Sequence, residues 1–128
     1  ERRLEVEGRS LHLVHGSPRR INEYLLPTRD RRTFERIAAD EGADILVFGH
    51  THKAWHRSYG GIFFVNVPSV GRPTDGDPRA AYTLLHLSSP AEPEVEVVRV
   101  AYDRERVAEL MLASGLPQEL ADTIRTGR

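Results

Sequence analysis

Short apolar runs separated by turn residues dominate the pattern of hydrophobic and polar positions along this chain. Period-two alternation and short apolar runs predict strands at 4–7, 10–14, 44–48, 53–58, 62–66, 81–87 and 94–100. Helical spacing predicts a helix from a cap at Thr28 or Asp30 to about Asp40, with Gly42 as its stop. Two further helices are expected, one from Asp103 to about Ser114 and a short one opened by Pro117.

The order of these elements predicts the fold class. A helix between strands, followed by a run of antiparallel-looking strands, indicates an α/β (α+β) protein in which one sheet packs on another. Residues Phe34, Ile37 and Ala38 form the expected apolar stripe of the first helix. With 128 residues, 39% of them hydrophobic, and no repeat, we expect 1–128 to form one domain or a large part of one.

Two of the predicted strands end in histidines. The run Ile45 to Phe48 is followed by Gly49-His50-Thr51-His52, and the run Leu11 to Val14 is followed by His15-Gly16. Ligand sites of open α/β sheets collect at the carboxyl ends of parallel strands. We therefore take His15, His50 and His52 as candidate metal ligands, although a single His-Gly after a strand is more often an ordinary turn.

The other histidines are not assigned as metal ligands. His12 alternates with Leu11 and Leu13, which predicts that it faces solvent, and His86 receives the same interpretation within its strand. His56 follows Trp55 and is compatible with either the histidine site or a loop.

Composition and charge narrow the classes of function. The formal net charge is −1, so no overall positive field favours nucleic acid, and no membrane span or apolar leader is visible. The absence of cysteine leaves histidine and carboxylate as metal ligands, and a cytoplasmic location is expected. Arg19 and Arg20 follow His15 closely and either lie on a solvated face or meet a phosphorylated substrate.

Six segments in order strengthen the histidine site. They are His15-Gly16-Ser17-Pro18 with Asn22-Glu23-Tyr24-Leu25, Gly49-His50-Thr51-His52-Lys53, Trp55-His56-Arg57, Phe64-Val65-Asn66, Ser69-Val70-Gly71-Arg72-Pro73 and Asp75-Gly76-Asp77-Pro78-Arg79. Together they resemble the calcineurin-like metallophosphoesterase superfamily, and within it the small bacterial and archaeal phosphodiesterase-type group. The resemblance covers most of residues 4 to 126.

The resemblance implies a β-sandwich flanked by helices and a two-metal hydrolase site. It implies that His15 and His50 bind one ion and His52 its neighbour, with Mn²⁺ expected and Fe, Zn or Ni as alternatives. The implied reaction is hydrolysis of a phosphodiester or phosphomonoester by a metal-activated water, on a phosphorylated small molecule or a nucleotide.

Several motifs of the superfamily are missing from this chain. The set of Asp-x-His, Gly-Asp and Gly-Asn-His-Asp/Glu motifs that the family carries in its N-terminal half is not present. We therefore expect 1–128 to be the C-terminal part of a metallophosphoesterase-like domain whose N-terminal half is absent. No catalytic residue is assigned, and the isolated chain is expected to be inactive without that half or self-association. Where relatives have Asn-x-Gly-Ser, this chain has Asn66-Val67-Pro68-Ser69, which predicts a reshaped loop if glycine's freedom is needed.

Three functions remain open at this stage. The first is a phosphoesterase half-domain that becomes active with the missing segment. The second is a non-catalytic binding or scaffolding module of the same fold, similar to the retromer scaffold subunit. The third is a structural fragment whose histidines bind a single adventitious ion.

Overall fold

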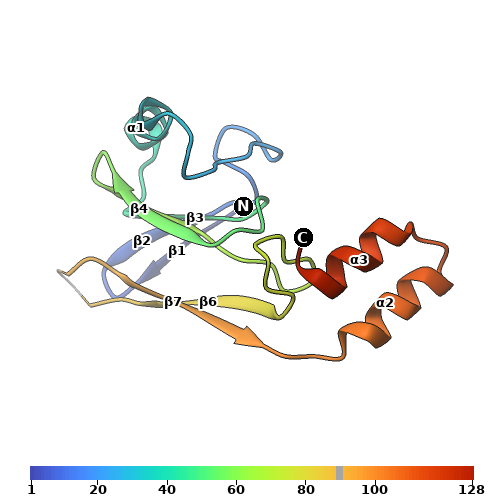
Figure 1. The fold of residues 1–128 in the computed structure, drawn as a ribbon. Coiled ribbons are helices and arrows are strands. Elements are labelled where there is room, and N and C mark those ends of the chain that lie inside the picture. Colours follow the sequence, from blue (N-terminus) through green and yellow to red (C-terminus); the bar gives the residue numbers. More distant parts are fainter. Residues whose placement is uncertain (89–90) are drawn as a thin grey trace.

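The computed structural model describes residues 1–88 and 91–128 and arranges them in layers (Figure 1). Helix α1 (Arg31–Asp40) covers one face of a five-stranded sheet, and a two-stranded sheet covers part of the other face. A pair of helices, α2 (Arg104–Ala113) and α3 (Gln118–Thr126), extends to one side. The predicted strands and helices are all present, and their bounds differ from the predicted ones by at most two residues.

The five-stranded sheet places the strand ends that carry the histidines. Its order is β1 (Arg2–Val6), β2 (Arg9–Leu13), β3 (Ile45–Phe48), β5 (Ile62–Asn66) and β4 (Trp55–Tyr59). The outer pairs β1–β2 and β4–β5 are antiparallel hairpins, whereas β3 runs parallel to both β2 and β5. The carboxyl ends of β2, β3 and β5 therefore lie next to one another.

Helix α1 builds the larger core on one face of this sheet. The Asp30 side chain accepts a hydrogen bond from the Arg32 backbone N–H, which selects Asp30 over Thr28 as the cap. The buried residues of α1 pack with aromatic side chains of the sheet, among them Phe48 and Phe64. The helix ends at Asp40, as predicted. Its C-cap is Glu41, whose backbone is extended (φ −89°, ψ 129°), and Gly42 follows without a positive φ.

The second sheet covers the opposite face. Strands β6 (Ala80–His86) and β7 (Glu94–Val100) form an antiparallel pair. The side chains of Leu85, Leu87 and Val95 pack on a cluster formed by Leu11, Ile45, Phe63 and Val65. The outward face of this pair leaves Tyr82, Leu84 and Val100 between 41 and 46% exposed. The layered α/β architecture with one sheet on another is thus as predicted.

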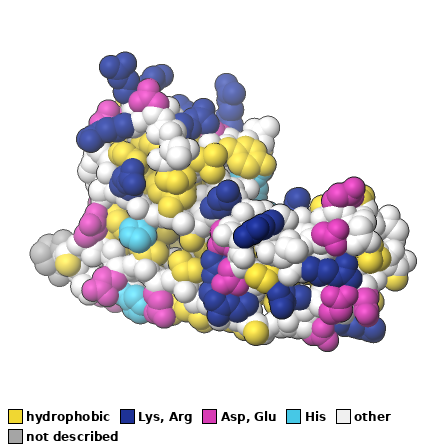
Figure 2. Space-filling model, in the orientation of Figure 1, with side chains coloured by type: hydrophobic (Ala, Val, Ile, Leu, Met, Phe, Trp, Pro, Cys, Tyr) yellow, Lys and Arg dark blue, Asp and Glu magenta, His cyan; other side chains and the backbone are white. Residues whose placement is uncertain are grey.

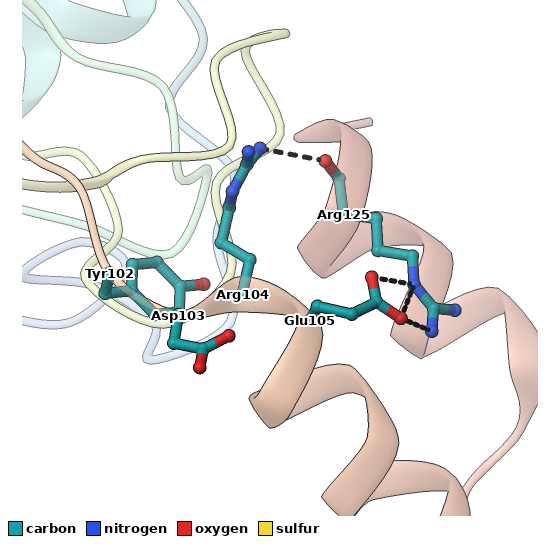
Figure 3. Close-up of a pocket in the computed structure, with 5 residues that line it drawn as sticks. All are labelled: Tyr102, Asp103, Arg104, Glu105 and Arg125. Atoms are coloured by element: carbon teal, nitrogen blue, oxygen red, sulfur yellow. Dashed lines mark hydrogen bonds and ion pairs between the residues drawn. The ribbon is translucent and has the colours of Figure 1, made fainter.

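The two C-terminal helices are joined by charged contacts. The Arg125 guanidinium contacts the Glu105 carboxylate, and Arg104 donates to the Arg125 carbonyl at 3.1 Å (Figure 3). The α3 end is held at Gly127, whose carbonyl accepts from the Gly76 N–H at 2.8 Å. A Cβ at Gly127 would lie 2.8 Å from the Asp77 carbonyl carbon, so this docking requires glycine.

The prediction that His12 faces solvent is wrong. His12 is only 3% exposed, and its Nδ1 lies 2.7 Å from the Glu41 carboxylate, which Arg3 also contacts at 3.0 Å. The prediction from alternation assumed that one face of the sheet is exposed to solvent. Strand β2 is an interior strand, however, and both of its faces are covered. His86 is exposed as predicted, and His56 lies exposed on β4 with its ring beside Phe63.

Charged side chains are distributed over the surface. Figure 2 shows Lys and Arg side chains in several separate places on this face, with Asp and Glu between them. Within residues 1–88 and 91–128, none of the three helices has the length and apolar character of a membrane span.

Candidate metal centre

The parallel pairing of β2 and β3 brings two candidate ligands together. Beyond the strands, the Val14 N–H donates to the Val47 carbonyl at 3.0 Å and the Gly49 N–H to the His15 carbonyl at 2.8 Å. This pairing aligns the two strand ends residue by residue. The His15 Nε2 then lies 2.9 Å from the His50 Nδ1, with the ring centres 4.8 Å apart.

The spacing of these two nitrogens fits a shared metal ion. Two imidazole nitrogens that lie about 2.1 Å from one ion, at about a right angle to each other, are about 3 Å apart. The two nitrogens form a ring-to-ring hydrogen bond at 2.9 Å, and this distance also agrees with that separation. Imidazole nitrogens also suit Mn, Fe, Zn and Ni alike, so the pair fits a divalent ion without selecting one.

The backbone of both histidines after β3 is left-handed. His50 has φ 67° and His52 has φ 59°, and only Glu7 among the other described non-glycine residues shares a positive φ. Around His50 the Thr51 N–H donates to the Gly49 carbonyl at 2.8 Å, which closes a γ-turn with a positive φ at its centre. Such a turn is strained for a side-chain-bearing residue, and strain of this kind gathers at functional sites.

His52 is oriented by a different loop. Its Nδ1 lies 2.7 Å from the Arg72 carbonyl oxygen, so Nδ1 carries the proton and Nε2 is the nitrogen left for a ligand bond. The Thr74 hydroxyl donates to the Thr51 carbonyl in the same region. Across the described residues, no three His, Asp or Glu side chains are placed to hold one ion together. The structure therefore joins His15 with His50 and does not add His52 to that group.

Buried polar atoms surround the His50 turn. The Asn66 amide at the end of β5 donates to the Thr51 hydroxyl, and both residues are buried. In the part of the chain that the structure describes, the Asn66 Oδ1 and the His50 Nε2 are buried without a hydrogen-bond partner. Unsatisfied buried polar atoms are uncommon in folded proteins and are found where a site is incomplete or binds an ion.

Two residues near the histidines had no assigned role in the sequence analysis. The Tyr24 ring packs against the His50 ring with 4.2 Å between their centres, and Tyr24 is itself 54% exposed. Asn66 was quoted only as part of a motif. Neither contact follows from strand or helix periodicity, because both depend on how loops fold over the strand ends.

The loop after His15 is held by a carboxylate. Glu23 accepts hydrogen bonds from the Ser17 hydroxyl and from Arg19, whose Nε lies at 3.2 Å. Burial would raise the pKa of Glu23, but the hydrogen bonds from Arg19 and Ser17 and the charges of Arg19 and Arg29 outweigh it and lower that pKa. A Cβ at Gly16 would lie 2.5 Å from the Ile21 carbonyl oxygen, so the tight turn requires glycine.

Two carboxylates in the loop before β6 are already engaged by arginines. Asp75 binds Arg99, and Asp77 accepts from the Arg79 guanidinium at 3.1 Å. The hydrogen bonds from Arg79 hold the pKa of Asp77 far below its usual range. The cavity in Figure 3, lined by Tyr102, Asp103, Arg104, Glu105 and Arg125, lies between α2 and α3 and contains no predicted ligand.

Pro68, the local departure from the resembling motif, lies directly after the last sheet hydrogen bond. The Val67 N–H donates to the Phe48 carbonyl at 2.8 Å, and Ser69 next accepts from the Ala81 N–H at 3.1 Å. Proline's missing N–H is therefore not needed by the sheet at this point.

Comparison with known proteins places this arrangement in a family. Residues 1–90 match the calcineurin-like phosphoesterase superfamily domain. The chain belongs to this superfamily. The resemblance noted from the motifs is thereby confirmed.

Similar proteins match nearly the whole chain, two of them in fold. An uncharacterized protein of Methanocaldococcus jannaschii is 26% identical over 96% of this chain and 54% of its own length. The structure of a metallophosphoesterase from Sphaerobacter thermophilus matches with a TM-score of 0.79 and 26% identity, covering 98% of this chain and 57% of that one. A hypothetical protein from Pyrococcus horikoshii matches with a TM-score of 0.83 and 18% identity, covering 98% and 50%.

A more distant likeness shows the fold alone. The structure of Vps29 from Entamoeba histolytica, complexed with zinc, matches with a TM-score of 0.50 and 21% identity over 77% of this chain and 59% of that one. The chain thus spans between half and three-fifths of the length of each of these relatives.

Proposed function

We propose that this chain supplies the histidine half of a two-metal phosphoesterase site. The observation that carries the proposal is the His15–His50 pair, whose nitrogens lie 2.9 Å apart at the ends of two parallel strands. In this proposal His15 and His50 hold one divalent ion, and the free Nε2 of His52 faces a second one.

The residues of the chain have distinct tasks in this proposal. The Arg72 carbonyl fixes the tautomer of His52, and the Tyr24 ring restricts the orientation of His50. When bound, divalent ions supply Lewis-acid stabilisation of the phosphoryl oxygens and an activated water for in-line attack. The substrate class is a phosphodiester or phosphomonoester, a phosphorylated small molecule or nucleotide, and Mn²⁺ is the expected ion. A cytoplasmic location belongs to the same proposal.

The proposal also includes a second segment that carries carboxylates. Histidines alone leave two cations facing each other with little charge compensation, and Asp75 and Asp77 are held by arginines. The metallophosphoesterase from Sphaerobacter thermophilus is longer than this chain, which covers 57% of it. We therefore treat 1–128 as the C-terminal part of a domain completed by an N-terminal half or by self-association.

Reconstitution tests the proposal. A polypeptide carrying the Asp-x-His and Gly-Asn-His motifs is mixed with the chain, and complex formation by size exclusion and hydrolysis of an aryl phosphodiester with Mn²⁺ are measured in the same samples. Activity is expected only in the mixture, and His50→Ala or His52→Ala should abolish turnover without preventing association. His86→Ala, at an exposed position on β6, is the matched control. Full activity in the His50→Ala mixture would refute the ligand assignment.

The alternative function is a non-catalytic binding or scaffolding module. The exposed apolar strip of Tyr82, Leu84 and Val100 on the outward face of β6–β7 favours it, since such strips mark interaction surfaces. A reconstituted complex that binds metal but never hydrolyses a phosphoester would support this alternative over the enzyme.

A further inference from the structure

Three arginines surround two adjoining cavities next to the candidate metal centre. One cavity of about 210 Å³ is lined by His15, Ser17, Arg19 and Arg20, with Glu1 and the apolar side chains of Val14, Pro18 and Ile21. The other, of about 320 Å³, is lined by Arg19, Arg20, Glu23 and Arg29. Arg19 and Arg20 belong to both cavities, so they separate the histidine side from the second space.

Two of the three guanidinium groups are already engaged. Arg19 Nε donates to the Glu23 carboxylate at 3.2 Å. Arg29 donates to the Tyr24 carbonyl at 2.9 Å and lies 3.7 Å from the same carboxylate. Both groups therefore shape the loop, and Glu23 neutralises one of their charges.

Arg20 differs from its neighbours. Its backbone is fixed, because its N–H donates to the Ser17 hydroxyl at 3.0 Å and its carbonyl accepts from the Ser17 N–H at 3.0 Å. Its guanidinium has no hydrogen-bond or ion-pair partner among the described residues. A positioned backbone with an unengaged planar donor is suited to binding an anion from solution.

We propose that the Arg20 guanidinium binds a second phosphate group of the substrate, separate from the phosphoryl group that reacts at the histidines. This inference rests on the proposed function. Arg20 lines the His15 cavity and the cavity beyond it, so a ligand that bridges the two places one phosphate on each side. The substrate class is then a nucleotide or another compound with at least two phosphate groups.

The charges of the second cavity fit a dianionic group. Arg19, Arg20 and Arg29 contribute three positive charges and Glu23 one negative charge, which leaves two positive charges uncompensated. A carboxylate ligand would balance only one of them. Glu1 lies at the histidine side of Arg20, with its carboxylate 3.5 Å from the His12 Nε2, and it does not line the second cavity.

A binding experiment without metal tests Arg20 directly. The 128-residue chain, labelled with ¹⁵N at arginine, is titrated with inorganic pyrophosphate in EDTA while the side-chain Nε–H signals are recorded. The Nε–H signal of Arg20 is identified by its absence from the spectrum of Arg20→Ala. In the wild-type chain this signal is expected to shift saturably with pyrophosphate. Arg20→Ala should weaken pyrophosphate binding about tenfold, the loss of one charge-assisted contact, and Arg20→Lys should lose less.

The matched control is Arg106→Ala, which removes the same charge from the exposed surface of α2. It should leave pyrophosphate binding unchanged. Equal weakening by Arg20→Ala and Arg106→Ala, or a wild-type chain that does not bind pyrophosphate, would overturn the proposal. So would loss of binding in Arg19→Ala with full binding in Arg20→Ala.

A kinetic experiment separates this inference from the proposed function. In the metal-loaded reconstituted complex, the 4-nitrophenyl ester of thymidine 5′-phosphate is compared with the same ester bearing a 3′-phosphate. The wild type should prefer the doubly phosphorylated ester, and Arg20→Ala should reduce that preference in kcat/KM about tenfold. Equal preference in both proteins refutes the role of Arg20. Failure to hydrolyse either ester refutes the proposed function, while the pyrophosphate result still decides the role of Arg20.

Discussion

His50 illustrates how this chain uses strained residues. Its ring must meet His15 across two strands, and a γ-turn with positive φ provides the necessary change of direction. A glycine would adopt this backbone more easily but would provide no ligand. His50 and His52 thus have a strained backbone at two of the three proposed ligand positions, which supports the proposed role in metal binding.

This strain predicts a difference between two variants that both lack the ring. His50→Gly should be more stable than His50→Ala by about 1 kcal/mol, because glycine adopts positive φ without a Cβ penalty. Both variants should lose the metal contact equally. Urea unfolding of the metal-free proteins measures the difference, and equal midpoints with equal slopes would show that the turn relaxes in the alanine variant.

The burial of His12 leads to a prediction about the stability of the chain. The His12 imidazole and the Glu41 carboxylate are both buried, so His12→Ala removes a buried hydrogen bond and leaves a cavity, while Arg3 remains in contact with the carboxylate. His12→Ala should cost about 2–4 kcal/mol, whereas His86→Ala at an exposed site should stay within about 0.5 kcal/mol. Denaturant unfolding at pH 7 compares them. A His12→Ala chain as stable as the His86→Ala chain would mean that Glu41 finds solvent when its partner is gone.

At the level of elements, periodic segments were predictable from the sequence and irregular ones were not. The strands, including the one before His50, and the first helix carry local signals, so their positions followed from alternation and turn residues. The sequence left Thr28 and Asp30 both open as the cap, and only the structure selects Asp30. The burial of His12 depended on which strand became interior. The Tyr24 contact and the Arg72 hydrogen bond to His52 depend on long loops, whose paths are not indicated by any periodicity in the sequence.

The loop element from Ser17 to Glu23 gives a prediction about pH. The folded chain lowers the pKa of Glu23 below its ordinary value of 4.5, so this carboxylate stabilises the fold above that value. The contribution disappears as the pH falls through the lowered pKa. Glu23→Gln should therefore destabilise the chain at pH 7, and the difference should shrink as the pH falls below 4.5. Urea midpoints of the two proteins at pH 7 and at a series of acidic pH values provide the measurement, and a pH-independent difference would contradict the assigned charge effect.

At the scale of the whole molecule, the two sheets cover each other incompletely. The two-stranded sheet lies against a five-stranded one, and Leu4 and Val6 on β1 stay 41% and 40% exposed. Both residues lie on an edge strand of the five-stranded sheet. We predict that the chain associates with itself or with a segment that pairs with this edge.

The whole molecule also sets the expected metal affinity. Three imidazoles in two groups, without a bridging carboxylate, should bind Mn²⁺ weakly in the isolated chain. Calorimetric titration is expected to show no tight site, and a His15→Ala control should reduce the weak signal further. Two tight sites per chain would mean that carboxylates of this chain, or of a second copy, complete the centre.

The position of β3 in the sheet has a consequence for the order of folding. The three antiparallel pairs join strands close in sequence, so each can form early as a local hairpin. Strand β3 instead pairs in parallel with β2 and β5, across longer stretches of chain, and it must insert between two hairpins. His15 and His50 therefore meet only when that insertion is complete. The pair should thus become able to bind metal no faster than β3 pairs with β2.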